Sequence, residues 1–286
     1  MQAAFIGLGI MGSRMAKNLL CKEVALKVFN RSENPLRELE KFGATVAQSP
    51  KEAVRDADVV FTMLSSPEVV EKIALAEEGF VAAMKDNAIW VDCSTVNPSF
   101  SLKESRVAQR HHVRFVDAPV AGSKPQAEKA ELVFFVGADK DTVTDIEPLL
   151  KFMGNKIVYV GEPGKGTSFK MLVNSLLAQA MLAFSEALLL GEKLGLPKEF
   201  LLDTLPNLPV CAPFIKAKAE MIRSGDDEAH FPLELMHKDL HLVAATAYEN
   251  NQPLMAANLA KEVYADAKRS GYGRKDFASI YKFLRK

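Results

Sequence analysis

The sequence predicts an α/β domain with a doubly wound, mostly parallel sheet, followed by an all-α domain around one long helix. Two observations support this fold class. Short β-branched runs alternate with helical patterns, at residues 3–6, 26–29, 58–64, 88–92, 114–117, 132–136 and 157–160. After residues 161–166 the pattern becomes helical and no further strand pattern follows. We therefore expect one domain over residues 1–162 and a second, all-helical domain over residues 163–286.

The first strand pattern leads into a glycine-rich turn, and a helical pattern over residues 13–20 follows it. The turn reads Gly7-Leu8-Gly9-Ile10-Met11-Gly12. In such a unit the first glycine permits a sharp turn, the second admits a pyrophosphate, and the third lets the helix pack on the strand. The helix N-terminus also favours phosphate charge. These features predict a Rossmann dinucleotide-binding domain, whose ligand the later loops Leu64-Ser65 and Ser94-Thr95 would also reach.

The second strand pattern ends at Asn30-Arg31-Ser32, about 20 residues after the turn, where the ribose 2′-hydroxyl is read. A chain selective for NAD usually carries a carboxylate at this place. Arg31 can instead pair with a 2′-phosphate, and Asn30 and Ser32 can add neutral hydrogen bonds. We therefore expect NADP(H) to be preferred over NAD(H). The alternative is that Arg31 is a solvated loop charge.

Composition argues against several other classes of protein. The 36 basic and 36 acidic residues give a formal net charge of zero, so the charge excess of a nucleic-acid binder is absent. No segment resembles a membrane-surface helix. His237 and His241 have the spacing of a helical metal pair, but no third ligand motif accompanies them, and we expect no metal. Because a strand pattern begins at residue 2, we expect no signal peptide and a cytoplasmic location.

The long helical pattern runs to about residue 194, and Glu186 is its only charged residue between positions 171 and 190. We expect this helix to be buried nearly all round in a bundle, and to lie between subunits of a homodimer or homotetramer. Polar residues, among them Asn174 and Gln179, argue against a membrane-spanning helix. Further helices are predicted over residues 198–204, 212–224, 232–249, 253–269 and 275–284.

Lys170 lies near the N-terminal end of the long helix, and Asn174 follows one turn later on the same face. The positive end of the helix dipole disfavours a lysine there, which indicates a specific role. When hydride reaches a carbonyl carbon, an ammonium can stabilise the oxyanion and protonate it, and Asn174 would orient that ammonium. The alternative is a surface lysine whose stem packs along the helix.

Four motifs, in this order, resemble those of the β-hydroxyacid dehydrogenases. They are the glycine turn, the loop Asp117-Ala118-Pro119-Val120-Ala121-Gly122-Ser123, the segment from Gly164 to Asn174, and Lys238-Asp239-Leu240. The resemblance implies that Lys170 is the catalytic lysine and that Thr95 and Lys238 line the nicotinamide and substrate region. It also implies that Gly122 and Ser123 belong to the loop that binds a substrate carboxylate.

Within that family, Asn30-Arg31 and Gly122-Ser123-Lys124-Pro125 look most like the glyoxylate/succinic semialdehyde reductases. In that branch Phe231 and Asp239 also border the substrate pocket. The resemblance thus implies NADPH-dependent reduction of small aldehydes or 2-oxo acids that carry a carboxylate.

The chain departs from the family pattern at Ala121, where a serine is usual. One hydroxyl donor to the substrate carboxylate is lost, and we expect Ala121→Ser to lower the KM for such a substrate. Three alternatives remain. The first is a 3-hydroxyisobutyrate dehydrogenase, which would be expected to prefer NAD, against Asn30-Arg31. The second is an imine reductase, which generally lacks the lysine found here at position 170. The third is a catalytically silent, cofactor-binding interaction protein, which would not need that lysine.

Overall fold

The computed structural model of the chain describes residues 1–285. The chain divides into two compact units, unit 1 (Met1–Lys170) and unit 2 (Met171–Lys286). Unit 1 is built on a nine-stranded, mostly parallel sheet, and unit 2 contains helices and one isolated β-bridge among its described residues. The predicted fold class is thereby confirmed.

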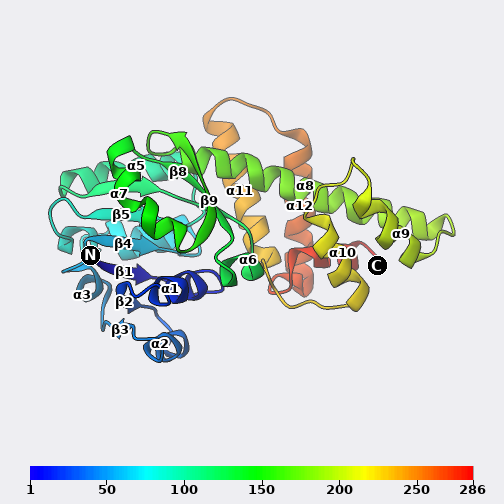
Figure 1. The fold of residues 1–286 in the computed structure, drawn as a ribbon. Helices are drawn as coiled ribbons and strands as arrows, with labels where there is room; N and C mark the ends of the chain where they lie inside the picture. Colours follow the sequence, from blue (N-terminus) through cyan, green and yellow to red (C-terminus); the bar gives the residue numbers. More distant parts are fainter. Residues whose placement is uncertain (286) are drawn as a thin grey trace. The chain divides into compact units, whose positions relative to one another are not determined.

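The sheet of unit 1 has the strand order of a doubly wound fold (Figure 1). Its strands are β1 (Gln2–Ile6), β2 (Ala25–Phe29), β3 (Thr45–Val46), β4 (Val59–Thr62), β5 (Ile89–Asp92), β6 (Arg114–Asp117), β7 (Val120–Ala121), β8 (Leu132–Gly137) and β9 (Gly154–Gly161). The order is β3-β2-β1-β4-β5-β6-β8-β7, and β9 pairs with β8. All pairs from β3 to β6 are parallel, whereas β8 is antiparallel to β6 and β7. The order reverses direction at β1, so the glycine turn lies at the switch point where such folds bind ligands.

Helices cover both faces of this sheet, because successive strand residues point to opposite sides. Phe5 and Phe61 pack with α1 (Gly12–Leu20), α2 (Glu33–Glu40), α6 (Lys124–Glu128) and α7 (Lys140–Lys151). Their neighbours Ile6 and Val60 pack on the other face with α3 (Pro50–Val54), α4 (Pro67–Val70), the π-helix η1 (Glu71–Leu75), the 3₁₀ turn η2 (Val81–Ala83) and α5 (Pro98–Arg110). Strands buried on both faces explain the continuous apolar runs in the sequence.

Unit 2 is a helical bundle with its own core. The long helix α8 (Lys165–Lys193) begins in unit 1 and continues through unit 2. It is followed by α9 (Lys198–Thr204), the 3₁₀ turn η3 (Leu205–Asn207), α10 (Ile215–Ser224), α11 (Leu233–Glu249), α12 (Met255–Ala267), η4 (Lys268–Tyr272), η5 (Phe277–Ser279) and α13 (Ile280–Leu284). Met181 of α8, Leu240 of α11 and Tyr264 of α12 meet in the core. The helix predicted over 275–284 is instead a 3₁₀ turn followed by α13, because Asp276 caps the turn.

The prediction that α8 is buried nearly all round is wrong for the single chain. Leu172, Leu176 and Leu190 are 62%, 70% and 61% exposed, while Met181 and Leu188 on the opposite face are fully buried. By length and composition, α8 is the one helix among the described residues that could cross a membrane, a test that core helices of soluble proteins also pass. Its buried face includes polar groups of Asn174 and Ser185, which a lipid-facing helix would have to desolvate.

Candidate active site

The turn between β1 and α1 has the shape that a dinucleotide pyrophosphate requires. Gly7 has a φ of 96°, and a Cβ there would lie 2.4 Å from the carbonyl oxygen of Met63. A Cβ at Gly12 would lie 2.0 Å from the carbonyl oxygen of Gly7. At Gly9 a Cβ would meet no atom within 4 Å. The turn itself therefore requires Gly7 and Gly12, whereas Gly9 leaves room for a ligand to approach the backbone.

Asn30, which follows β2, holds this turn from the neighbouring strand. Its Oδ1 accepts a hydrogen bond from the N–H of Leu8 at 3.0 Å, and its Nδ2 donates to the carbonyl oxygen of Ser32 at 3.0 Å. Leu8 is buried, while Ile10 and Met11 are half-buried in the same turn. Asn30 thus has a structural role in the glycine turn that the sequence pattern did not reveal.

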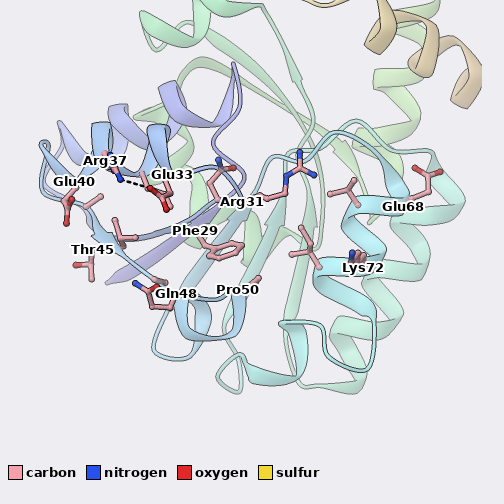
Figure 2. A pocket seen from close by; sticks show the side chains of 17 residues that line it. Phe29, Arg31, Glu33, Arg37, Glu40, Thr45, Gln48, Pro50, Glu68 and Lys72 are labelled. Carbon is pink, nitrogen blue, oxygen red and sulfur yellow. Dashed lines mark hydrogen bonds and ion pairs between the residues drawn. The ribbon is translucent and has the colours of Figure 1, made fainter.

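A cavity of about 1330 Å³ lies beside the end of β2, lined by residues of β2, α2, β3, α4 and η1. Figure 2 shows Arg31 extending between the side that carries Glu33 and Arg37 and the side that carries Glu68 and Lys72. Arg37 forms an ion pair with Glu33 at 2.7 Å. The cavity is lined by three cationic side chains, Arg31, Arg37 and Lys72, and three acidic ones, Glu33, Glu40 and Glu68. Arg31 is the cation that directly follows the end of β2, where a ribose phosphate is read.

Polar residues connect the loops that follow β4 and β5. Ser94 Oγ donates to Asp92 Oδ1 at 2.6 Å and accepts a hydrogen bond from the N–H of Leu64 at 2.9 Å. Asp92 is buried at the end of β5. The next residues along the two loops are Ser65, which is exposed, and Thr95, which is half-buried. Two loops that the sequence assigned to the dinucleotide are thus joined through the hydroxyl of Ser94, which the buried carboxylate of Asp92 holds in place.

Asp92 belongs to a cluster of buried carboxyl groups at this edge of the sheet. Thr62, Asp92 and Asp117 are register partners on β4, β5 and β6, and Glu104 of α5 is fully buried. No N–H or hydroxyl of the described residues donates to either oxygen of Glu104. Burial and the charge of Asp92 raise the pKa of Glu104 well above its usual value, and burial also raises the pKa of Asp92. We interpret Asp92 and Glu104 as a pair that shares one proton.

The predicted substrate loop has part of its polar groups already engaged. Ala121 ends β7 and pairs with Val133 of β8, and Gly122 has a φ of 111°. The N–H and the hydroxyl of Ser123 both donate to Gln126 Oε1, at 2.9 and 3.0 Å. Ser123 is the N-cap of α6. Its side chain thus caps a helix, and a contact with a substrate carboxylate stays a prediction.

Lys170 lies in the second turn of α8 and is only 7% exposed. Thr167 precedes it by three residues and Asn174 follows it by four, so the three side chains share one face of the helix. Thr167 and Asn174 are also buried. This burial argues against the alternative of a solvated surface lysine, because such a lysine would extend its ammonium into water.

In unit 2, Asn174 is held by a residue from a distant helix. Its Nδ2 donates to Asp239 Oδ2 at 2.6 Å, and Asp239 Oδ1 forms an ion pair with Lys238 Nζ at 2.8 Å. Asp239 is 2% exposed. No described residue donates a hydrogen bond to Asn174 Oδ1, which is buried. Asp239 therefore fixes the amide of Asn174 so that its oxygen stays available as an acceptor.

Phe231 is positioned by a buried ion pair that sequence reasoning missed. Asp276 Oδ1 pairs with Lys218 Nζ at 2.7 Å, and Asp276 Oδ2 accepts from the N–H groups of His230 and Phe231 at 3.0 and 3.1 Å. The ring of Phe231 meets Phe277 edge to face at 5.6 Å. No local pattern marks Lys218 and Asp276 as partners, because 58 residues separate them.

Residues 1–285 contain no group of three or more His, Cys, Asp and Glu side chains that could hold a metal ion. His237 and His241 are neighbours on α11, and burial together with the charges of Lys268 and His241 lowers the pKa of His237.

A glycine turn at the switch point of this sheet is the architecture of a dinucleotide-binding domain, and here a helical unit follows it. Residues 2–161 match the family model of the NAD binding domain of 6-phosphogluconate dehydrogenase. Residues 164–284 match the model described as NAD-binding of NADP-dependent 3-hydroxyisobutyrate dehydrogenase. The chain belongs to the 3-hydroxyisobutyrate dehydrogenase-like family of β-hydroxyacid dehydrogenases, which confirms the family that the motifs indicated.

Similar proteins cover nearly the whole chain. The 2-(hydroxymethyl)glutarate dehydrogenase of Eubacterium barkeri is 34% identical over 279 residues, which cover 97% of this chain and 93% of that protein. Glyoxylate/succinic semialdehyde reductase 1 of Arabidopsis thaliana is 32% identical over 280 residues, covering 98% and 97%. The solved structure of Mycobacterium tuberculosis 3-hydroxyisobutyrate dehydrogenase with L-serine has a TM-score of 0.90 at 29% identity and covers 100% of both chains. All three proteins are named as dehydrogenases or reductases, so they share a reaction class, but their names give different substrates.

Proposed function

We propose that the protein is an NADPH-dependent reductase of small aldehydes or 2-oxo acids that carry a carboxylate, with glyoxylate and succinic semialdehyde as leading substrates. The observation that carries this proposal is the burial of Lys170 on the polar face of α8, one turn before Asn174. The likeness to glyoxylate/succinic semialdehyde reductase 1 supports the choice of substrates.

A nicotinamide dinucleotide held at the glycine turn would supply the hydride that reduces the carbonyl carbon of the substrate. Lys170 donates a hydrogen bond to the carbonyl oxygen and transfers a proton to it as negative charge develops there. Asn174 Oδ1 is the acceptor that would orient the ammonium during the reaction, while its Nδ2 is held by Asp239 at 2.6 Å. A fixed acceptor lowers the cost of orienting the flexible lysine side chain.

The preference for NADPH rests on the cavity beside β2. Arg31 lines it directly after β2, and the next acid along the chain, Glu33, is paired with Arg37 at 2.7 Å. A guanidinium at this position suits a 2′-phosphate, which a carboxylate at the end of β2 would repel. The other predicted contacts, Thr95, Gly122 and Ser123 in unit 1 and Phe231, Lys238 and Asp239 in unit 2, are proposed as substrate or nicotinamide contacts.

We propose a cytoplasmic homodimer or homotetramer. The exposed leucines of α8, Leu172, Leu176 and Leu190, support an oligomer, because a second chain would remove them from water.

A second candidate is a 3-hydroxyisobutyrate dehydrogenase, which the likeness to the M. tuberculosis structure favours. Oxidation of NADPH and NADH by wild-type protein, with glyoxylate, succinic semialdehyde, methylmalonate semialdehyde and tartronate semialdehyde, separates the two. The proposal expects turnover of the first two substrates with NADPH. A clear preference for methylmalonate semialdehyde with NADH would support the second candidate.

The same assay tests the proton donor. Lys170→Ala should lower kcat by about 100-fold or more with every substrate, because a general acid is removed. Lys156→Ala, a change at an exposed lysine of β9, is the matched control and should leave kcat unaltered. Full activity in Lys170→Ala would exclude Lys170 as the donor.

A further inference from the structure

Asp117, the last residue of β6, holds the beginning of α8. Its side chain is 1% exposed. Oδ1 accepts a hydrogen bond from the N–H of Gly164 at 2.7 Å, and Oδ2 accepts from the N–H and the hydroxyl of Thr167 at 2.6 and 3.0 Å. Since α8 begins at Lys165, the N–H of Thr167 is one of those that a helix N-terminus leaves without an intrahelical acceptor. Asp117 therefore caps α8 from a different element of the fold.

The contact between Asp117 and the first turn of α8 lies between two glycines, Gly137 and Gly166. A Cβ at Gly137 would lie 2.4 Å from Asp117 Oδ1. A Cβ at Gly166 would lie 2.3 Å from the carbonyl oxygen of Phe135 and 3.0 Å from Asp117 Oδ2. Glycine at these two positions lets the strand, the carboxylate and the first turn of α8 approach one another. The first turn of the helix thus has little freedom to move while the cap is in place.

Lys170 follows Thr167 by three residues, less than one helical turn, on the same buried face. A shift or rotation of the first turn would therefore be passed directly to Lys170. We propose that Asp117 is a positioning residue for Lys170, because its carboxylate sets the place at which α8 presents the ammonium. This inference rests on the proposed role of Lys170 as proton donor.

The ionisation of Asp117 supports this role. Both oxygens accept hydrogen bonds, which the carboxylate can do and a protonated carboxyl group cannot do equally well. Burial raises the pKa of Asp117 from 3.8 to about 6, against the opposing effect of the donors at Thr167 and Gly164. The cap is therefore fully formed only above about pH 6.

The charged groups around Asp117 come from four neighbouring elements. Glu104 of α5 and Asp92 of β5 belong to the buried carboxyl cluster. Lys165 at the start of α8 and Glu162 before it are exposed. Asp139 at the start of α7 is bonded to Thr142. The buried neighbours from α5 and β5 are acids, whereas Lys170, on the same face of α8 as Thr167, is a buried cation. Desolvation is the largest cause of the raised pKa of Asp117.

This arrangement makes activity and stability depend on pH in opposite directions. The folded-state pKa lies above the value of 3.8, so folding favours the protonated form of Asp117, and its contribution to stability is lost as pH rises from about 4 to 6. The cap, and with it kcat, is gained as pH rises through about 6. A merely structural carboxylate would change stability without producing this acid limb in kcat.

The test compares pH profiles of kcat with NADPH and a carboxylate-bearing aldehyde for the wild type, Asp117→Asn and Asp145→Asn. Asp145 is an exposed aspartate paired with Arg114 at 2.6 Å and is the matched control. Asp117→Asn should lower kcat by up to about 100-fold, because misplacement of a catalytic group by about 1 Å costs that much. Its KM for NADPH should stay within about twofold, and its acid limb near pH 6 should disappear. An unchanged acid limb with unchanged kcat would overturn the inference.

If Asp117→Asn does not fold, kcat is measured in Thr167→Val instead. It keeps the N–H that bonds to Asp117 Oδ2 and removes the hydroxyl that bonds to the same oxygen and lies 2.9 Å from Ser101 Oγ. We expect a smaller loss of kcat in the same direction. Wild-type kcat in Thr167→Val, together with a failed fold in Asp117→Asn, would mean that Asp117 is needed for folding alone.

Two further measurements separate this inference from the proposed function. If Asp117 acts through Lys170, the double variant Asp117→Asn/Lys170→Ala should have the same residual single-turnover rate as Lys170→Ala alone. A double variant in which the losses of the two single variants multiply in full would overturn the inference. Activity retained by Lys170→Ala alone overturns the role of Lys170 instead. In that case amide exchange of residues 164–170, measured without substrate, still reports the cap. Faster exchange in Asp117→Asn is expected, and unchanged exchange contradicts a cap.

Discussion

Unit 1 and unit 2 stabilise their buried carboxylates by different means. In unit 1, Asp92 accepts hydrogen bonds from hydroxyl groups, among them Thr62 at 2.6 Å, and Asp117 accepts from two N–H groups and a hydroxyl. Glu104 is fully buried, and the charge of Asp92 contributes to raising its pKa. Desolvation is the largest cause of the raised pKa of all three acids, and for Glu104 the charge of Asp92 adds to it.

In unit 2, the buried carboxylates face lysines. Asp276 pairs with Lys218 at 2.7 Å, and Asp239 pairs with Lys238 at 2.8 Å. Burial lowers the pKa of Lys218, and the charge of Asp276 opposes that shift. The comparison teaches that the two units accommodate buried acids differently. The acids of unit 1 accept hydrogen bonds from neutral groups or lie beside another acid, whereas those of unit 2 form ion pairs with lysines.

The largest expected effect comes from breaking the buried pair of unit 2. Asp276→Ala should lower the free energy of unfolding by about 3–5 kcal/mol, because it leaves the Lys218 ammonium buried without a counter-charge. The N–H groups of His230, Phe231 and Ala278 also lose their acceptor. Urea unfolding followed by circular dichroism measures the change.

The matched control is Glu262→Ala, since Glu262 is a largely exposed partner of Lys261 at 3.0 Å in the same unit. It should cost less than about 1 kcal/mol. Equal losses in the two variants would remove the distinction between buried and exposed pairs in unit 2.

A smaller effect is expected at the second pair. Asp239→Asn leaves one acceptor for two donors, the ammonium of Lys238 and the Nδ2 of Asn174, and should cost about 1–3 kcal/mol of unfolding free energy. Because Asn174 loses its orientation, kcat should also fall, while the KM for NADPH stays close to the wild-type value. Glu249→Gln, at an exposed acid of α11, is the matched control and should leave kcat unaltered. A wild-type kcat in Asp239→Asn would argue against Asp239 as the group that orients Asn174.

The smallest effect tests the acids of unit 1 and is visible as a pH dependence. The folded state keeps the proton of Glu104 above pH 4.5, where the unfolded chain loses it, so the stability of the wild type falls as pH rises above that value. Glu104→Gln removes this dependence, and its new N–H can donate to Asp92 Oδ2, which receives no hydrogen bond from the described residues. Between pH 5 and 6 the stability of Glu104→Gln relative to wild type should rise by up to about 1.4 kcal/mol.

Thermal unfolding at a series of pH values provides the measurement. Glu71→Gln, at an exposed acid paired with Lys103 at 2.7 Å, should show the wild-type slope. A pH-independent difference between Glu104→Gln and wild type would mean that Glu104 is ionised in the folded chain.

Much of unit 1 could be predicted because its signals are local. The steric demand at Gly7 and Gly12 and the alternation of strands and helices depend on residues close in sequence. The two-residue strands β3 and β7 were missed because they are too short to show a period. Glu104 gave no signal of burial, since a glutamate on an amphipathic helix is normally solvated, and Ser101 and Ala108 share its buried face.

The sequence by itself determined the fold class, the glycine turn, the family and the choice of Lys170 and Asn174, because periodicity and motif spacing are properties of short segments. Only the tertiary structure decided what holds those residues. Asp117 meets Thr167 across 50 residues and Asn174 meets Asp239 across 65, and folding alone brings such partners within hydrogen-bond distance. The physical reason is that the neighbours and the burial of a carboxylate determine its pKa in the folded chain and the group that it can position. Those neighbours and that burial are supplied by residues far away in the sequence.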